Sequence, residues 1–160
     1  MACSENMNTA KMSQTYRSDT LHFSMQYSTD FEVLQNPKDV NSIAFVRKQN
    51  EGKNLFQENM VCWTEEMPMA ISDSIYLQAS ITQLKISNPA LNIFKNQAVK
   101  LGDNTFSSFS FDYTAKNNTQ FSVRGYCIVK GQRGYNFSCT AIKVEMPEKI
   151  KIFEQMLSTF

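Results

Sequence analysis

The chain has 160 residues, of which 42% are hydrophobic and 12% are aromatic. This length and composition predict one domain with a hydrophobic core and exclude a wholly disordered chain. Sixteen basic residues against fifteen acidic residues leave a formal net charge of +1. We therefore expect no nucleic-acid partner and no polybasic membrane-binding patch. The sequence also contains no apolar run long enough to span a bilayer.

The first nineteen residues differ in composition from the rest of the chain. Residues 1–19 are rich in Ser, Asn, Thr and Met and follow neither the helix nor the strand period, which predicts a flexible leader ahead of a single domain at 20–160. The Ala2-Cys3 pair resembles the end of a bacterial lipobox, in which a small residue precedes the lipidated Cys. On this interpretation Cys3 is the lipid attachment site, and Met1 is a start placed where a signal peptide was removed. The alternative is an ordinary cytoplasmic N-terminus.

Apolar and polar residues then alternate, which predicts half-buried strands. The strands expected in this first half of the chain are residues 21–27, 31–34, 43–47 and 56–64. In the last of them, Met60, Cys62 and Thr64 should lie on one face and Val61 and Trp63 on the other.

The period changes from two to about 3.6 at residues 72–87. Leu77, Ile81 and Leu84 recur at helical spacing, and a Ser or Asp within 72–74 can serve as the N-cap. The Asn-Pro pair that follows should end the helix, because the residue before Pro disfavours the α region.

Short turns separate the strands of the second half, so neighbouring strands should pair antiparallel in a meander. The expected strands are residues 93–101, 106–113, 119–130 and 135–142. Gly131 and Gly134 bound the last turn, and we expect Cys127 and Cys139 to face the same apolar side of the hairpin that it closes.

A second helix is expected at the C-terminus. Pro147 is favourable in a first helical turn, where its missing N–H costs nothing. Ile150, Phe153, Leu157 and Phe160 then form an apolar stripe, which predicts that this helix packs on the body of the domain.

The order of these elements carries a resemblance. The aromatic strand at 21–27 is followed by Asp-Phe at 30–31, the strand beginning at 58–61, a helix, the meander and a C-terminal helix that ends in Met-Leu-Ser-Thr-Phe at 156–160. This arrangement, over residues 20–160, resembles the PsbP-like superfamily, which includes the extrinsic P subunit of photosystem II, DcrB-type bacterial lipoproteins and Mog-type proteins. The resemblance implies an α+β fold in which an antiparallel meander is flanked by helices as an α/β/α sandwich. It also implies a non-catalytic function, either docking on a larger assembly or acting as an envelope accessory protein.

Two positions depart from the family pattern. The family often has Tyr-Pro followed by Trp where this chain has Tyr27, Ser28 and Phe31. The Gly that commonly precedes the first Phe of the family is replaced by His22.

Few residues suggest catalysis. His22, the only imidazole, lies on the polar side of its strand with no nucleophile identifiable nearby, so we interpret it as a surface residue. Cys62, Cys127 and Cys139 lack zinc-ligand spacing and fit buried free thiols, although an oxidising compartment could bridge one pair. We therefore expect no catalytic residue, cofactor or metal.

The acidic residues and methionines are also better explained without a ligand. Glu65 and Glu66 fit a solvated strand end and Asp73 fits a helix cap, since Ca²⁺ needs more oxygens at closer spacing. The nine Met are scattered, which favours core packing over a copper site.

Three classes of function remain from the sequence. The first is a non-catalytic envelope lipoprotein, lipid-anchored in the periplasm or outer membrane and monomeric, whose only membrane contact is the anchor and whose partner is an unidentified envelope protein. The second is a carrier or chaperone for an apolar ligand or peptide, and the third is an enzyme with an unrecognised site. A large apolar pocket would favour the carrier. Buried titratable groups with perturbed pKa values would favour the enzyme, and an exposed apolar patch would favour the docking domain.

Overall fold

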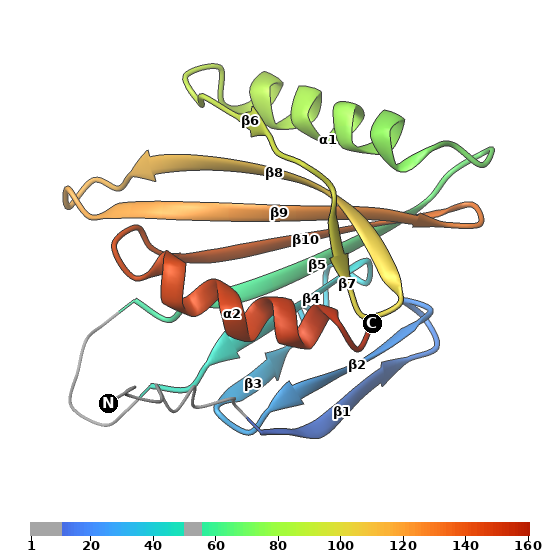
Figure 1. The fold of residues 1–160 in the computed structure, drawn as a ribbon, viewed down its shortest axis with the longest axis horizontal. Helices are drawn as coiled ribbons and strands as arrows, with labels where there is room; N and C mark the ends of the chain where they lie inside the picture. The colour runs from blue at the N-terminus through green and yellow to red at the C-terminus, as the bar shows by residue number, and fades with distance from the viewer. Residues whose placement is uncertain (1–10, 50–55) are drawn as a thin grey trace, which may run out of the picture.

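The computed structural model describes residues 11–49 and 56–160, which form an eight-stranded antiparallel sheet with one helix on each face, and a separate two-stranded sheet (Figure 1). The strands and helices are, in order, β1 (Met12–Ser18), β2 (Phe23–Ser28), β3 (Phe31–Leu34), β4 (Ser42–Arg47), β5 (Asn59–Glu66), α1 (Asp73–Ser87), β6 (Phe94–Lys95), β7 (Val99–Leu101), β8 (Asn104–Thr114), β9 (Gln120–Lys130), β10 (Arg133–Ile142) and α2 (Met146–Leu157). The eight-stranded sheet has the order β3-β4-β5-β10-β9-β8-β6, with β7 paired to β8. The predicted α+β class and the antiparallel meander of β8, β9 and β10 are confirmed.

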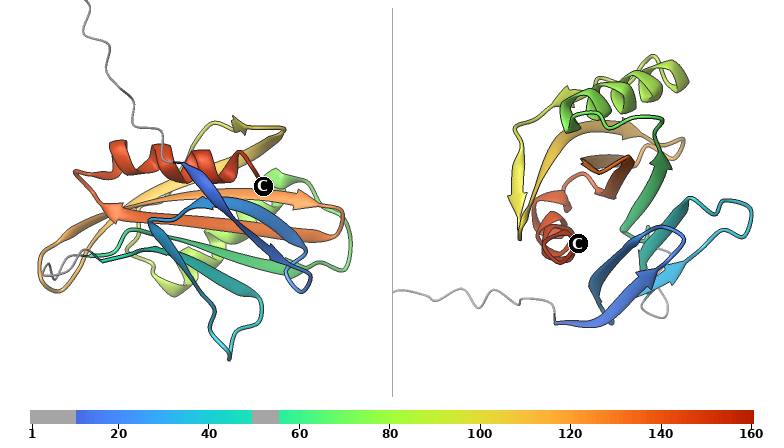
Figure 2. Two further views of the ribbon diagram at one scale, coloured as in Figure 1. Left: turned by 90° about the horizontal axis from the view of Figure 1, so that it is seen from below. Right: turned by 90° about the vertical axis from the view of Figure 1, so that its right-hand side faces the viewer.

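The larger hydrophobic core lies between the sheet and α2. Figure 2 shows α2 on the concave side of the curved sheet with the β1–β2 hairpin beside it. Phe153 and Leu157 of the predicted apolar stripe are buried, and Ile150 and Phe160 are partly buried against the same core. The Phe160 ring lies 5.0 Å from the ring centroids of both Tyr135 and Phe137. The predicted docking of the C-terminal helix is therefore confirmed.

A smaller core lies between the other face of the sheet and α1. The predicted helix is present: Ser72 is its N-cap, and the Ser72 hydroxyl accepts a hydrogen bond from the Ile75 N–H at 3.3 Å. Leu77 and Ile81 are buried together with Tyr76, while Leu84 is only partly buried. The α1 helix thus has a narrower apolar contact with the sheet than α2 has.

The predicted leader is wrong over Met12–Ser18, which forms β1 and pairs antiparallel with β2. Only a few residues hold this strand to the core, because most of its side chains are polar and exposed. The Tyr16 ring packs against Phe23 at 5.5 Å and against Phe45 at 5.6 Å between centroids. One aromatic in a polar strand leaves no alternating pattern in the sequence. Residues 1–10, including Cys3, lie outside the described part of the chain.

The predicted common orientation of Cys127 and Cys139 is also wrong. The turn between β9 and β10 consists of Gly131 and one further residue, so Lys130 pairs with Arg133. Odd-numbered residues of β9 are therefore paired with even-numbered residues of β10 and share a face with them. Cys127 faces α1 and Cys139 faces α2, and both are fully buried.

The predicted strand at 93–101 is divided in two. β6 and β7 pair with different parts of β8, and the Asn96 N–H between them donates to the Ser108 carbonyl at 2.9 Å. The Asn96 side chain also donates to the Ser110 hydroxyl at 3.1 Å. These hydrogen bonds replace the regular ladder at this point, so the segment bends instead of continuing as one strand.

Candidate functional site

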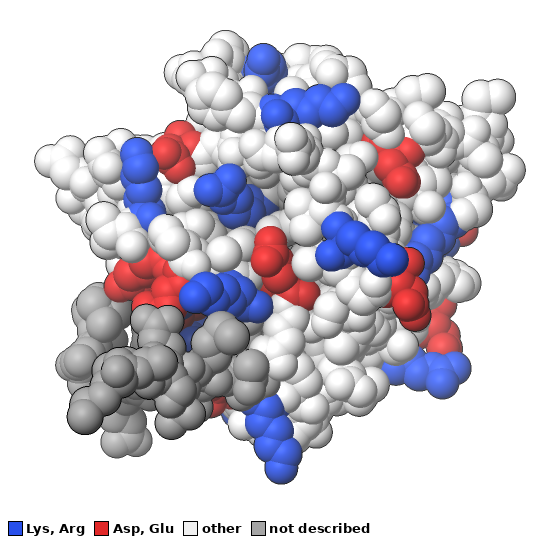
Figure 3. Space-filling model, viewed as in Figure 1, with Lys and Arg blue, Asp and Glu red and all other residues white. Residues whose placement is uncertain are grey.

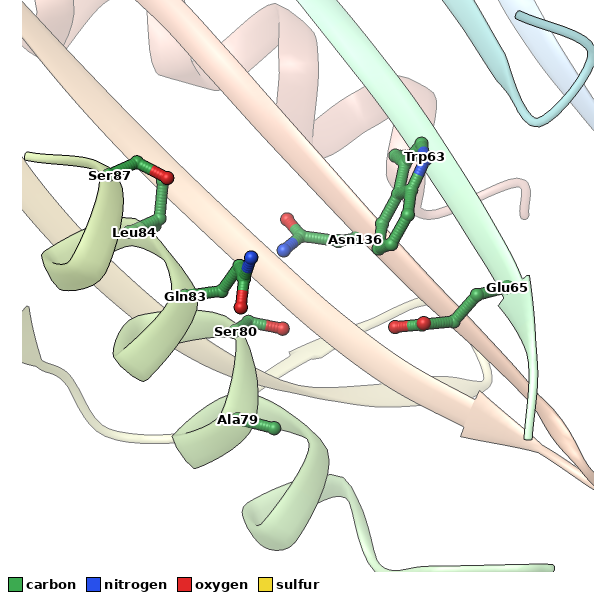
Figure 4. A pocket seen from close by; sticks show the side chains of 8 residues that line it. All are labelled: Trp63, Glu65, Ala79, Ser80, Gln83, Leu84, Ser87 and Asn136. Carbon is green, nitrogen blue, oxygen red and sulfur yellow. The ribbon is translucent and has the colours of Figure 1, made fainter. Parts of the chain in front are cut away.

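The candidate site is a groove between α1 and the strands β5 and β10. The α1 helix packs against β8 and β9, so the sheet surface next to it is less covered. The groove has a volume of about 660 Å³, which lies within the usual range for ligand sites. Its lining residues are Trp63, Glu65, Ala79, Ser80, Gln83, Leu84, Ser87 and Asn136 (Figure 4).

The strand side of the groove follows from the alternation in β5. Met60, Cys62 and Thr64 are fully buried on the α2 side, as predicted. Trp63 and Glu65 therefore lie on the opposite face and border the groove, where 41% of the Trp63 surface is exposed. An exposed Trp in a central strand is unusual, because covering its large apolar surface lowers the free energy.

Asn136 is the nearest neighbour of Trp63 on the adjacent strand. The two residues are directly paired in the register of β10 and β5. The Asn136 Oδ1 atom is buried and has no hydrogen-bond partner among the described residues. Leaving such an atom unpaired costs free energy, so an unpaired amide bordering a groove favours a ligand that supplies a donor.

Gly134 allows α1 to approach the strand side of the groove. A Cβ atom at Gly134 would lie 2.4 Å from Cζ of Tyr76, so the Tyr76 ring lies directly over the glycine. Burial raises the pKa of the Tyr76 hydroxyl well above its usual value, and the negative charge of Glu65 raises it further. Tyr76 is therefore a neutral packing residue, and its neighbour Glu65 is the charged group of the groove.

His22 is exposed, as predicted, and lies away from this groove. It borders a smaller hollow of about 300 Å³ with Glu66 and Arg133. Its backbone adopts a φ of +57°, and its carbonyl accepts a hydrogen bond from the Tyr135 hydroxyl at 2.9 Å. A left-handed backbone at this position favours glycine, the residue that the resemblance in the sequence implied here.

The three described cysteines are free and fully buried. Burial raises the pKa of the Cys127 thiol to about 12 and raises the pKa of Cys62 and of Cys139 well above the usual value. Because the thiolate is the reactive form, these thiols are poor nucleophiles and poor metal ligands.

The two adjacent glutamates lie on different faces. Glu66 pairs with Arg133, whereas Glu65 borders the groove. Asp73 accepts a hydrogen bond from the Val129 N–H at 2.6 Å and so ties the start of α1 to β9. Within residues 11–49 and 56–160, no group of three or more His, Cys, Asp or Glu side chains is placed to hold a metal ion.

Charge is mixed on the face of the molecule that Figure 3 shows. On the face shown in Figure 3, Lys and Arg side chains lie among Asp and Glu instead of gathering into one patch. In the described part of the chain, neither helix has the length and apolar character needed to cross a membrane.

Sequence reasoning missed most of the groove. Its residues come from three separate segments, and the polar side chains of α1 and Asn136 have no motif in common. The signal that was present is the pair Trp63 and Gly134: a large aromatic on the polar side of a strand, and a glycine within the next strand of the sheet. Only the register brings them to the same face.

Sequence comparison finds no matching family model and no matching curated protein. Comparison with solved structures finds clear matches at low identity. A crystal structure from Bacteroides thetaiotaomicron VPI-5482 matches with a TM-score of 0.63 and 15% identity, over 93% of this chain and 48% of that one. The chain thus spans about half the length of that protein.

Two further matches cover most of both chains. LpqN of Mycobacterium tuberculosis, described as involved in cell envelope biogenesis, matches with a TM-score of 0.59 and 16% identity over 82% of this chain and 78% of LpqN. The solution structure of cyanobacterial PsbP from Synechocystis sp. PCC 6803 matches with a TM-score of 0.62 and 9% identity over 91% and 89%. The fold is PsbP-like, as the resemblance in the sequence implied.

Proposed function

We propose that the chain is a non-catalytic accessory domain of the bacterial cell envelope, which binds a partner protein through the groove between α1 and β5–β10. The observation that carries this proposal is the groove itself, with an exposed Trp63 beside Asn136, whose Oδ1 atom has no hydrogen-bond partner in the described part of the chain. The fold shared with LpqN, a protein involved in cell envelope biogenesis, supports the cellular setting.

An exposed apolar stripe on α1 supports protein docking. Ile75 and Ile86 are 58% and 69% exposed, and their spacing of three helical turns puts them on one side of the helix. Ala79, on the same side, also lines the groove. An apolar stripe that leads into a groove is typical of a surface that a partner covers.

The mixed lining of the groove weakens the case for a carrier of an apolar ligand, although its exposed surface is more apolar than polar. Apart from Trp63, Ala79 and Leu84, the groove is lined by hydroxyl, amide and carboxylate side chains. A carrier site for an apolar molecule is lined mainly by apolar groups.

The buried titratable side chains do not favour an enzyme. The cysteines and Tyr76 are held in their neutral forms by burial, and His22 is exposed and outside the groove. A general screen with esterase, phosphatase, peptidase and glycosidase substrates should give no turnover. Turnover lost on mutation of His22 or a groove residue would replace this proposal with an enzyme.

The lipid anchor is a separate part of the proposal. When the protein is made with its own upstream sequence in cells fed an alkynyl fatty acid, we expect Cys3 to become labelled. The attached lipid should then keep the protein in the detergent phase of a detergent–water partition. The Cys3→Ser variant should move to the aqueous phase. Wild-type protein that stays aqueous and unlabelled would favour the cytoplasmic alternative.

Site-specific crosslinking tests the partner surface directly. A photoreactive amino acid at Gln83, in the groove, should crosslink to an envelope protein in the host cell, whereas the same amino acid at the exposed Lys85 of α1, outside the groove lining, should not. Crosslinks of equal yield at both positions, or none at Gln83, would overturn the groove as the partner surface.

A further inference from the structure

We infer that the groove recognises an extended peptide segment of its partner that carries a basic side chain. This inference rests on the proposed partner-binding function and names the chemistry of the segment that is bound. Three features of the groove lead to it: its charge, the placement of Trp63, and two amide side chains on opposite walls.

The charge of the groove favours a cationic ligand. Among the described residues that line the groove, Glu65 is the one charged residue, and none is Lys or Arg. Glu66, the adjacent residue on the opposite face, is by contrast paired with Arg133. An anionic ligand would meet the Glu65 carboxylate without a compensating cation, whereas a basic side chain would pair with it.

Trp63 adds a second preference for a cation. Trp63 and Glu65 are two residues apart in β5, so their side chains stand on the same face of the sheet as neighbours. The face of an indole ring attracts an ammonium or guanidinium group, and the attraction grows as water is excluded. A Lys or Arg chain lying along Trp63 would therefore bring its charged end to the Glu65 carboxylate.

The amides of Asn136 and Gln83 suit a peptide backbone. Asn136 projects from β10 and Gln83 from α1, and the two side chains point toward each other in Figure 4. A carboxamide carries both donors and an acceptor, so it can pair with the C=O and N–H of a peptide group. The Oδ1 atom of Asn136 has no partner among the described residues, and a backbone N–H of an extended ligand would satisfy it.

Trp63 also supplies the measurement, because it is the only tryptophan in the chain. The probes are the blocked pentapeptide Gly-Ala-Arg-Ala-Gly and the same peptide with citrulline, the uncharged analogue of Arg, at the centre. We expect the Arg peptide to change the Trp63 fluorescence saturably. The citrulline peptide should bind about two- to fivefold more weakly, as expected for one partly exposed ion pair.

Variants of Glu65 and Asn136 distinguish the contribution of the carboxylate to peptide binding from that of the amide. Glu65→Gln should reduce the difference between the Arg and citrulline peptides to the part that the Trp63 ring contributes, while Glu66→Gln, which removes the same charge from the other face of β5, should preserve the full difference. Asn136→Ala should weaken both peptides by a similar factor, because it removes a contact to the backbone that they share.

Three results would overturn the inference. They are no saturable change with the Arg peptide, equal affinity for the Arg and citrulline peptides, and a saturable change with a neutral oligosaccharide such as maltotriose in place of the peptide. If Gln83 still crosslinks to an envelope protein in any of these cases, the partner surface stands and only the peptide chemistry is wrong. If the peptide binds but Gln83 crosslinks to nothing, the proposed function fails separately.

Discussion

The face of the sheet that contacts α2 and the face that contacts α1 are built in different ways. On the α2 side, large buried residues from the helix, the sheet and the β1–β2 hairpin form one continuous core. On the α1 side, six buried residues form a smaller core, and the strands beyond it border the groove. The difference indicates that the α2 face provides most of the stability, while the α1 face leaves space for a ligand.

Two glycines on the α1 face of the sheet allow aromatic rings to pack directly on the backbone. A Cβ at Gly125 would lie 2.0 Å from the Phe109 ring, and a Cβ at Gly134 would lie 2.4 Å from the Tyr76 ring. Both rings therefore rest directly on the backbone of the sheet. This close approach sets the height of α1 above the sheet, and with it the width of the groove.

The largest effect expected from this comparison is on the α2 side. Phe153→Ala removes a fully buried ring from the larger core, and the free energy of unfolding should fall by about 3–5 kcal/mol. Leu84 of α1 is only partly buried, so Leu84→Ala should lower the free energy of unfolding by less than about 2 kcal/mol. Urea denaturation of both variants measures the difference, and equal losses would contradict the unequal division of the core.

Gly134→Ala tests the contact beneath α1. The new methyl group would displace the Tyr76 ring, at a cost of about 1–3 kcal/mol in the free energy of unfolding. In a Tyr76→Leu background, the same substitution should cost clearly less, because the atoms that would clash are gone. Additive losses in the double variant would show that Tyr76 does not rest on Gly134.

The buried thiols predict a loss of stability at high pH. The folded state keeps the Cys127 proton up to a pKa of about 12, whereas the unfolded chain loses it near pH 9. The unfolded state therefore binds fewer protons between these values, and stability falls as pH rises, by about 1.4 kcal/mol per pH unit for each such thiol. Cys62 and Cys139, on the α2 side, should add to this slope.

Denaturation between pH 8 and pH 11 measures that slope. Cys127→Ala should make the slope shallower by about 1.4 kcal/mol per pH unit, the contribution of one proton, in addition to any change in stability at neutral pH. A slope that is identical in the wild type and in the variant would mean that the thiol is less buried than the structure shows.

The smallest effect concerns the entry to β2. His22 adopts a φ of +57°, which glycine tolerates better than other residues. His22→Gly should raise the free energy of unfolding by about 0.5–1 kcal/mol, because a side chain in this region is strained. Thermal denaturation of His22→Gly and His22→Ala measures this, and an alanine variant as stable as the glycine variant would exclude strain at this position.

The sequence alone determined the elements with a strong local signal. The alternation in β2 and β5, the helical spacing in α1 and the stripe of α2 were all readable, because each is set by burial of neighbouring residues in one element. The short turns were sufficient to predict antiparallel pairing of β8, β9 and β10. The PsbP-like fold followed from the order of these elements.

Tertiary structure alone decided the features that depend on contacts between elements. β1 is a strand because Tyr16 packs against Phe23 and Phe45, which no local pattern in a polar segment indicates. A two-residue turn puts Cys127 and Cys139 on opposite faces, since a shift of one residue in register exchanges the two faces of a strand. The groove exists because α1 covers β8 and β9 more closely than it covers β5, and that position is set by packing between distant segments.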